Sequence, residues 1–108
     1  MLRKRESIKP KKSGFYAVSE NVVGREIEGE LIIVPLVSGM GNLEDELYTL
    51  NESGKAIWKK LDGTRKLKTV AEELAAEWDA PPEEIEEDVM GLARELLARG
   101  MLVEARKD

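Results

Sequence analysis

Carboxylates form the densest group of chemically capable side chains in this sequence. Five of them fall within one short stretch and could coordinate a divalent cation: Glu83, Glu84, Glu86, Glu87 and Asp88. The stretch opens a predicted helix, where the positive end of the helix dipole favours anions, and it lacks the spacing of a calcium-binding loop. We therefore interpret these residues as helix-stabilising, and the sequence predicts no metal site.

The residue types that most enzymes use for catalysis are absent. The chain has no His and no Cys, which excludes a histidine general base, a thiol nucleophile, a disulfide framework and most zinc or iron sites. The segment Gly39-Met40-Gly41 lacks the downstream glycine, basic residue and helix start of a phosphate-binding loop, so we interpret it as a connection. The sequence predicts no catalytic residue and no cofactor.

Charge is distributed unevenly along the 108 residues. Residues 1–12 carry a net charge of +5, whereas the whole chain carries −5, so the remaining residues carry −10. We predict a basic disordered tail at 1–14, one folded domain at 15–104 and a short tail at 105–108. No apolar run approaches the roughly 20 residues of a membrane span, and the N-terminal residues lack the apolar core of a secretory signal. We expect a cytoplasmic protein with no membrane partner.

In the first half of the chain, the residue pattern has the period of two that is typical of β-strands. Two β-branched runs at 22–27 and 31–37 flank a Gly-containing turn and predict a hairpin, to which a third strand at 46–50 is added. These elements predict a small three-stranded antiparallel sheet. Pro35 has no N–H to donate, so we expect the middle strand to bend or bulge there, or the backbone nitrogen of Pro35 to face outward from the sheet.

Three helices are predicted after residue 51, and a short strand at 101–104 follows them. Their ends are marked by an N-cap at Asn51, a capping box at Thr69 and Glu72, a proline pair at 81–82 and terminal glycines at 63 and 100. Trp58 and Trp78 fall on the apolar faces of their helices, so both are predicted to be buried. The predicted class is α+β, of the winged helix-turn-helix type, with that motif between 52 and 78.

The order of these elements and a series of short motifs resemble the PqqD family. The motifs are Leu50-Asn51, Gly54, Ala56, Ile57-Trp58, Asp62-Gly63, Thr69-Val70, Glu73-Leu74, Asp88-Val89, Leu96-Leu97 and Gly100-Met101-Leu102-Val103. The resemblance covers about residues 22–104. The chain departs from the pyrroloquinoline quinone proteins of the family at Val34-Pro35-Leu36 in the middle strand and at Leu61.

The resemblance implies peptide recognition without catalysis. Proteins of this family bind the leader segment of a ribosomally made precursor peptide and present it to a modifying enzyme. The implied partners are therefore a precursor leader peptide and a radical S-adenosylmethionine enzyme or another peptide-modifying enzyme. The resemblance further implies that the peptide adds as a strand to the edge of the third predicted strand, with the long last helix as the opposite wall.

The predicted peptide site has a strand wall and a helix wall. The strand wall is Leu47, Tyr48, Thr49 and Leu50, and the helix wall is Glu86, Met90, Ala93 and Leu97. The helix stripe lies beside the predicted core positions Ile85, Val89, Leu92 and Leu96. It is apolar at three places where a solvated face would be charged. That apolar surplus fits a binding groove or a wider core contact. On strand alternation alone, Tyr48 could pack inward or line the groove.

A winged-helix DNA-binding regulator is the alternative that the same helix pattern supports. Its recognition helix would be residues 70–78 or the long last helix. Both are acidic, whereas phosphate contacts require Lys and Arg. The basic residues 1–12 are the feature that favours this alternative. We expect no nucleic-acid partner.

Overall fold

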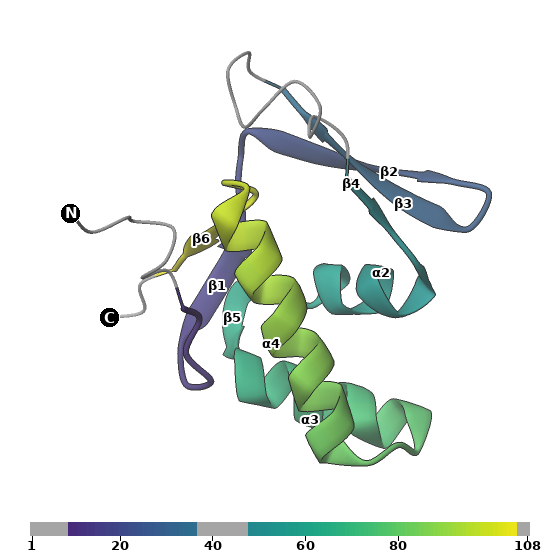
Figure 1. Cartoon of the computed structure of the whole chain (residues 1–108), viewed down its shortest axis with the longest axis vertical. Helices are drawn as coiled ribbons and strands as arrows, with labels where there is room; N and C mark the ends of the chain where they lie inside the picture. The colour runs from purple at the N-terminus through teal and green to yellow at the C-terminus, as the bar shows by residue number, and fades with distance from the viewer. Residues whose placement is uncertain (1–8, 37–47, 106–108) are drawn as a thin grey trace.

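A computed structural model describes residues 9–36 and 48–105, and within these ranges the chain forms two small sheets and three helices (Figure 1). The strands are β1 (Phe15–Val18), β2 (Val22–Ile27), β3 (Glu30–Pro35), β4 (Tyr48–Leu50), β5 (Asp62–Lys66) and β6 (Leu102–Glu104). The helices are α2 (Glu52–Lys59), α3 (Leu67–Trp78) and α4 (Pro82–Ala98). The α+β class is confirmed.

The predicted hairpin is formed by β2 and β3. Its two-residue turn, Glu28-Gly29, has φ angles of 52° and 86°, as the turn type that matches the twist of paired strands requires. β4 pairs with the other side of β3, placing Leu50 opposite Leu31. The strand order β2-β3-β4 therefore leaves β4 at an edge. Pro35 is the last residue of β3, so its missing N–H falls at the end of the ladder.

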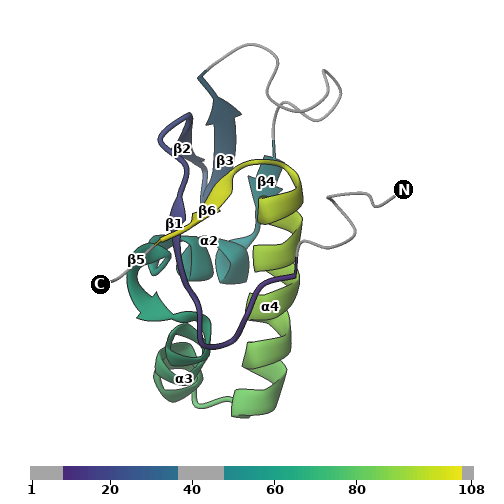
Figure 2. The ribbon, with the colours of Figure 1, turned by 90° about the vertical axis from the view of Figure 1, so that its left-hand side faces the viewer.

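A second sheet joins three segments that lie far apart in the sequence. β1 lies between β5 and β6 and is antiparallel to both. Figure 2 looks onto these strands, with the β2–β3 hairpin above them and α3 below. The predicted terminal strand belongs here, but β1 and β5 were not predicted. The prediction that Gly63 ends the first helix is wrong, because α2 ends at Lys59 and Gly63 lies within β5.

The starts of α2 and α4 follow their predicted boundary residues. Asn51 Oδ1 accepts a hydrogen bond from the Gly54 N–H at 2.9 Å, which confirms the N-cap. Pro82 is the first residue of α4, where its fixed φ suits a helix and its missing N–H leaves no intrahelical bond unmade.

The start of α3 differs from its prediction. This helix begins at Leu67 without a side-chain cap, so the capping box of Thr69 and Glu72 is wrong. β5 separates α2 from α3, and the tight connection between helices lies instead at residues 79–81, between α3 and α4. The two helices predicted to form a helix-turn-helix between residues 52 and 78 are therefore joined by a strand and not by a tight turn.

The core lies where the three helices face the two sheets. Its largest fully buried side chains come from both halves of the described chain: Ile33, Leu67, Val70, Leu74, Val89, Leu96 and Met101. Of the two tryptophans, Trp58 is half-buried at the edge of this core. Trp78 is 39% exposed, so the prediction of burial is wrong for it. Trp78 is the last residue of α3, and it lines an open hollow instead of the core.

Residues 9–14 run against the folded body. Hydrogen bonds join their main chain to α3 and to β1: Lys68 N to Lys12 O at 3.0 Å, Leu67 N to Gly14 O at 3.1 Å, and Lys11 N to the Tyr16 hydroxyl at 3.0 Å. The rest of the predicted N-terminal tail, residues 1–8, lies outside the described residues, as do residues 106–108. None of the helices in the described ranges has the length and apolarity that a membrane span requires.

Candidate functional site

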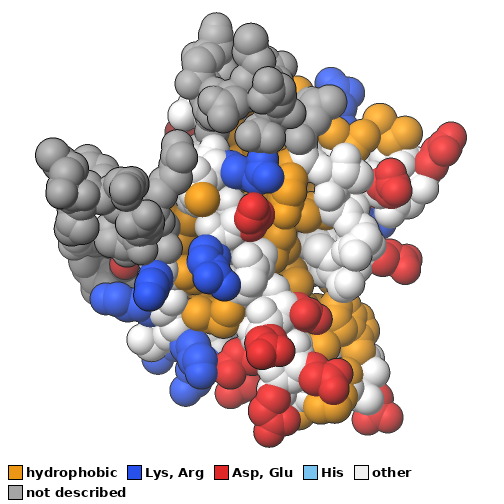
Figure 3. All heavy atoms as spheres, viewed as in Figure 1, with side chains coloured by type: hydrophobic (Ala, Val, Ile, Leu, Met, Phe, Trp, Pro, Cys, Tyr) orange, Lys and Arg blue, Asp and Glu red, His pale blue; other side chains and the backbone are white. Residues whose placement is uncertain are grey.

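A groove lies between the edge strand β4 and the helix α4. It encloses about 610 Å³ and is lined by Glu30, Tyr48, Thr49, Leu50, Asn51, Ser53, Gly54, Ile57, Asp88 and Leu92. Figure 3 shows a band of hydrophobic side chains on this face, between the α4 side and the β4 side. The groove therefore lies between a strand edge and two residues of α4, the acidic Asp88 and the apolar Leu92.

The strand wall of the groove has one free side. Within the described residues β4 pairs only with β3. In an antiparallel ladder the N–H and C=O of one residue face the same neighbour, so alternate residues of β4 present both groups to the groove. Three predicted site residues, Tyr48, Thr49 and Leu50, are in this strand, whereas the fourth, Leu47, lies outside the described residues.

The turn from β4 into α2 is fixed by close packing. A Cβ atom on Gly54 would lie 3.1 Å from the side chain of Leu50, so glycine lets α2 approach β4 this closely. Leu50 is buried and anchors the strand on the core, while Thr49 is exposed. The motif from Leu50 to Gly54 therefore sets the floor of the groove.

Arg99 and Tyr48 meet at the far end of α4. The Arg99 guanidinium lies 4.5 Å from the centroid of the Tyr48 ring, and one of its nitrogens lies 3.7 Å from the Glu95 carboxylate. Burial raises the pKa of Tyr48 above its ordinary value of 10.0, and the Glu95 charge adds to this rise while the Arg99 charge opposes it. Tyr48 is half-buried and also lines the groove, which answers the question that strand alternation left open.

The helix wall that lines the groove is formed by Asp88 and Leu92. The sequence placed Leu92 among the core positions. In the structure Ala93 is only 1% exposed and occupies the core between Val89 and Leu96, while Leu92 remains half-buried beside the groove. Ile85, Val89 and Leu96 are buried as predicted, so the helix differs from the prediction at one position, where Ala93 replaces Leu92 in the core.

The structure does not bring the four predicted helix-wall residues to this groove. Glu86 and Met90 line a smaller hollow together with Lys12, whose Nζ lies 3.4 Å from a Glu86 oxygen. Ala93 belongs to the core, and Leu97 is half-buried against it. Periodicity identified an apolar surplus on α4 but not the side of the helix that faces β4.

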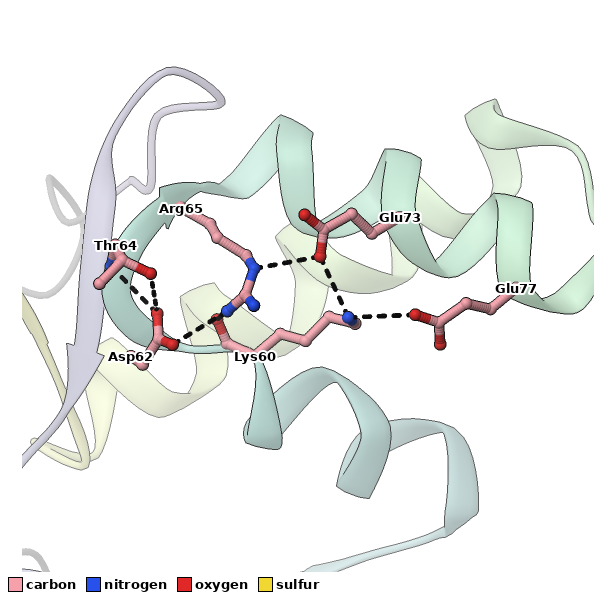
Figure 4. A network of polar contacts seen from close by, with 6 residues as sticks. All are labelled: Lys60, Asp62, Thr64, Arg65, Glu73 and Glu77. Carbon is pink, nitrogen blue, oxygen red and sulfur yellow. Dashed lines mark hydrogen bonds and ion pairs between the residues drawn. The ribbon is translucent and has the colours of Figure 1, made fainter.

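A separate cluster of charges ties α2, β5 and α3 together (Figure 4). Lys60 Nζ lies 3.0 Å from Glu73 and 3.1 Å from Glu77, while Arg65 lies 2.9 Å from Asp62 and 3.0 Å from Glu73. The hydrogen bond that Lys60 donates to Glu73 lowers the pKa of Glu73 and raises the pKa of Lys60. Each charge is thus paired, which fits a structural role.

The carboxylates of α4 do not form a metal site in the part of the chain that is described. No group of three or more Asp, Glu, His or Cys side chains there could hold a metal ion. The first turn of α4 does carry Glu83 and Glu84, where the helix dipole favours anions.

Residues 30–102 match the family described as Coenzyme PQQ synthesis protein D (PqqD). Over 58 residues the chain is 49% identical to the PqqA binding protein of Rhizobium meliloti (strain 1021). That stretch is 54% of this chain and 59% of the relative. The chain spans 59 to 63% of the length of the curated relatives that it matches.

Two solved structures share the fold. One is the solution NMR structure of the PqqD truncation of Methylobacterium extorquens PqqCD, described as a stand-alone RiPP recognition element. Its TM-score is 0.68 at 21% sequence identity, and the match covers 87% of this chain and 94% of that chain. The other is lasso peptide synthetase B1 complexed with the leader peptide, with a TM-score of 0.67, 19% identity, and coverage of 82% and 96%.

Proposed function

This chain belongs to the PqqD family, and we propose that it binds the leader segment of a ribosomally made precursor peptide without catalysing a reaction on it. The observation that carries the proposal is the edge of β4, which pairs only with β3 among the described strands and faces Leu92 of α4 across a groove of about 610 Å³. The relatives are named PqqA binding proteins, and this name supports a precursor peptide as the ligand.

The peptide binds by adding a strand to the β2-β3-β4 sheet. Its main chain bonds with the outward N–H and C=O groups of β4, which supplies affinity, and its alternate side chains enter the groove, which supplies specificity. From Asp88 to Arg99 the helix wall spans about 16 Å at about 1.5 Å per residue. An extended strand covers that distance with about five residues.

The bound leader is then presented to a second protein. We infer that this protein is a radical S-adenosylmethionine enzyme or another peptide-modifying enzyme in the cytoplasm, where precursor peptides are made. Holding the leader on a domain that also contacts the enzyme raises the effective concentration of the substrate at the enzyme. No cofactor is required for this role.

A DNA-binding regulator has less support from the charges on the helices. α3 carries Glu72, Glu73 and Glu77, which repel phosphate. The cations that contact these carboxylates, Lys60 and Arg65, are already paired with them.

Binding of a synthetic PqqA peptide tests the proposal. We suggest fluorescence anisotropy with the labelled Rhizobium meliloti PqqA sequence, with a scrambled peptide of the same composition and a labelled DNA duplex as controls. We expect saturable binding with a Kd below about 100 μM, at least about tenfold weaker binding of the scrambled peptide, and weak, salt-sensitive binding of DNA. Equal binding of both peptides, or tight sequence-selective binding of DNA, overturns the proposal.

A further inference from the structure

The groove continues beyond β4 into a second depression, named here the α2 hollow. It encloses about 710 Å³ and is lined by Glu52, Ser53, Lys55, Ala56, Lys59, Trp78, Ile85 and Asp88. Ser53 and Asp88 also line the β4–α4 groove. The two depressions therefore adjoin, and a peptide that leaves the end of β4 passes directly into the α2 hollow.

One wall of the α2 hollow is apolar. Trp78 ends α3 with 39% of its surface exposed, and Ile85 lies in the first turns of α4 on the same hollow. An exposed indole in a concave site provides a flat surface for the aliphatic part of a long side chain, and its π face attracts cations. The wall is therefore suited to a Lys or Arg side chain as well as to an apolar one.

The charges at the α2 hollow sum to a negative value. Its two lysines, Lys55 and Lys59, share the single carboxylate of Glu26 of β2, and Glu52 and Asp88 add two further negative charges. In contrast, no Lys or Arg nitrogen of the described residues lies within 4.0 Å of the carboxylates of Asp88 or Glu52. Figure 3 shows further carboxylates gathered over the same end of α4. A cation that enters here meets unpaired acidic groups and displaces no existing ion pair.

We propose that the α2 hollow binds a Lys or Arg side chain of the guest peptide, with its charge against Asp88 and its stem along Trp78. This inference rests on the proposed function, because it needs a peptide that follows β4. Asp88 lies one turn before Leu92 on α4 and borders both depressions. The basic residue therefore lies at the end of the paired segment that passes Leu50 and Asn51.

The test uses peptides chosen without prior assumption about their sequence. A display library of random linear peptides is selected on the wild-type chain. We expect enrichment of Lys or Arg at one position, at a fixed distance from an apolar residue. Affinities are then measured for one selected peptide and for the same peptide with its basic residue replaced by Gln. The Gln peptide should bind about three- to tenfold more weakly.

Two variants of the chain locate the effect. Asp88→Asn should weaken binding of the basic peptide by about three- to tenfold and leave the Gln peptide unaffected. Glu87→Gln is the matched control, because it removes the same charge from the adjacent residue of α4, which lines the smaller hollow at Lys12. We expect Glu87→Gln to bind both peptides like the wild type.

The two indole N–H resonances give an independent readout. Trp78 should shift when the basic peptide binds. Trp58 should not, since its Nε1 faces Gly24 of β2, where a Cβ would lie 3.2 Å away. If selected peptides perturb β4 but show no basic preference and bind Asp88→Asn like Glu87→Gln, the inference is overturned and the proposed function stands. If no selected peptide perturbs β4, the proposed function is itself overturned.

Discussion

The Arg99 guanidinium lies 4.5 Å from the centroid of the Tyr48 ring, which joins the C-cap of α4 to the first residue of β4. The two elements that wall the groove are thereby held at a fixed separation at this end. At the other end, the close approach of Gly54 to Leu50 fixes β4 on α2. One contact therefore ties β4 to α4 and the other ties β4 to α2.

The two charges near Tyr48 should shift its pKa in opposite directions. Arg99→Gln should raise the Tyr48 pKa further, because the Arg99 charge lowers it, and Glu95→Gln should reduce it, because the Glu95 charge raises it. The Cζ chemical shift of Tyr48, followed by NMR against pH, measures both effects. Shifts of the same sign in the two variants would contradict the geometry.

The same pKa predicts a loss of stability in alkali. The Tyr48 pKa in the folded chain lies above the ordinary 10.0. Its contribution to stability is therefore complete below about pH 10 and falls as the pH rises through the folded pKa. Urea unfolding at a series of alkaline pH values should show this fall, and the fall should be smaller in Tyr48→Phe, in which the raised pKa of Lys60 still contributes to it. An unchanged alkaline profile in that variant would refute the assignment.

The charge cluster of Figure 4 should make stability sensitive to acid. Hydrogen bonds to Thr64 lower the pKa of Asp62 below 3.8, and Lys60 lowers that of Glu73 below 4.5. The stability from these carboxylates is thus present above those ordinary values and is lost as the pH falls through the lower folded ones. Glu73→Gln should be less stable than the wild type at neutral pH, and the difference should shrink by pH 3. A constant difference across this range would argue against the linkage.

Two truncations should separate the basic N-terminal residues into a dispensable and a packed part. Removal of residues 1–8 leaves in place the hydrogen bonds that join residues 11–14 to Tyr16 and α3. Removal of residues 1–12 also deletes the bonds of Lys11 and Lys12 to Tyr16 and Lys68, at a cost of about 1–2 kcal/mol. We expect a fall in Tm of at least about 4 °C for the longer truncation alone, measured by circular dichroism. Equal melting of both truncations would show that these bonds contribute nothing.

A matched pair on α4 should identify the helix face that binds peptide. Leu92→Glu places a charge in the groove beside β4 and should weaken peptide binding by about ten- to a hundredfold. Met90→Glu places the same charge two residues away, in the hollow at Lys12, and should change affinity by less than about threefold. Circular dichroism controls for the fold of both variants. If Met90→Glu has the larger effect, the stripe expected from the sequence is the binding face.

Several elements could be predicted because their determinants are local. The β-branched runs around a Gly turn predicted the hairpin, and Asn51 and Pro82 predicted the starts of α2 and α4. The motif resemblance predicted peptide binding at the edge strand, which stays a prediction, and Tyr48, Thr49 and Leu50 line a groove there. These features depend on a few adjacent residues and need no knowledge of distant contacts.

The remaining features depend on contacts between distant segments. β1 and β5 have four and five residues and become a sheet only when β6 joins them from the other end of the chain. Asp62-Gly63 has the composition of a turn after a helix, yet both residues belong to strand β5 of that sheet. The choice of Ala93 over Leu92 for the core depends on how α4 packs against distant segments, which spacing alone does not reveal. By its spacing Trp78 falls on the apolar face of α3. It is, however, the last residue of that helix and is 39% exposed.

Intermolecular NOEs between an isotope-labelled chain and an unlabelled PqqA peptide test the central claim most directly. Strand addition predicts NOEs from peptide Hα and amide protons to Tyr48, Thr49 or Leu50, with side-chain NOEs to Leu92. The amides of residues 70–77 in α3 should remain unperturbed. A bound peptide whose NOEs fall on α3, with β4 and Leu92 unperturbed, would contradict the account.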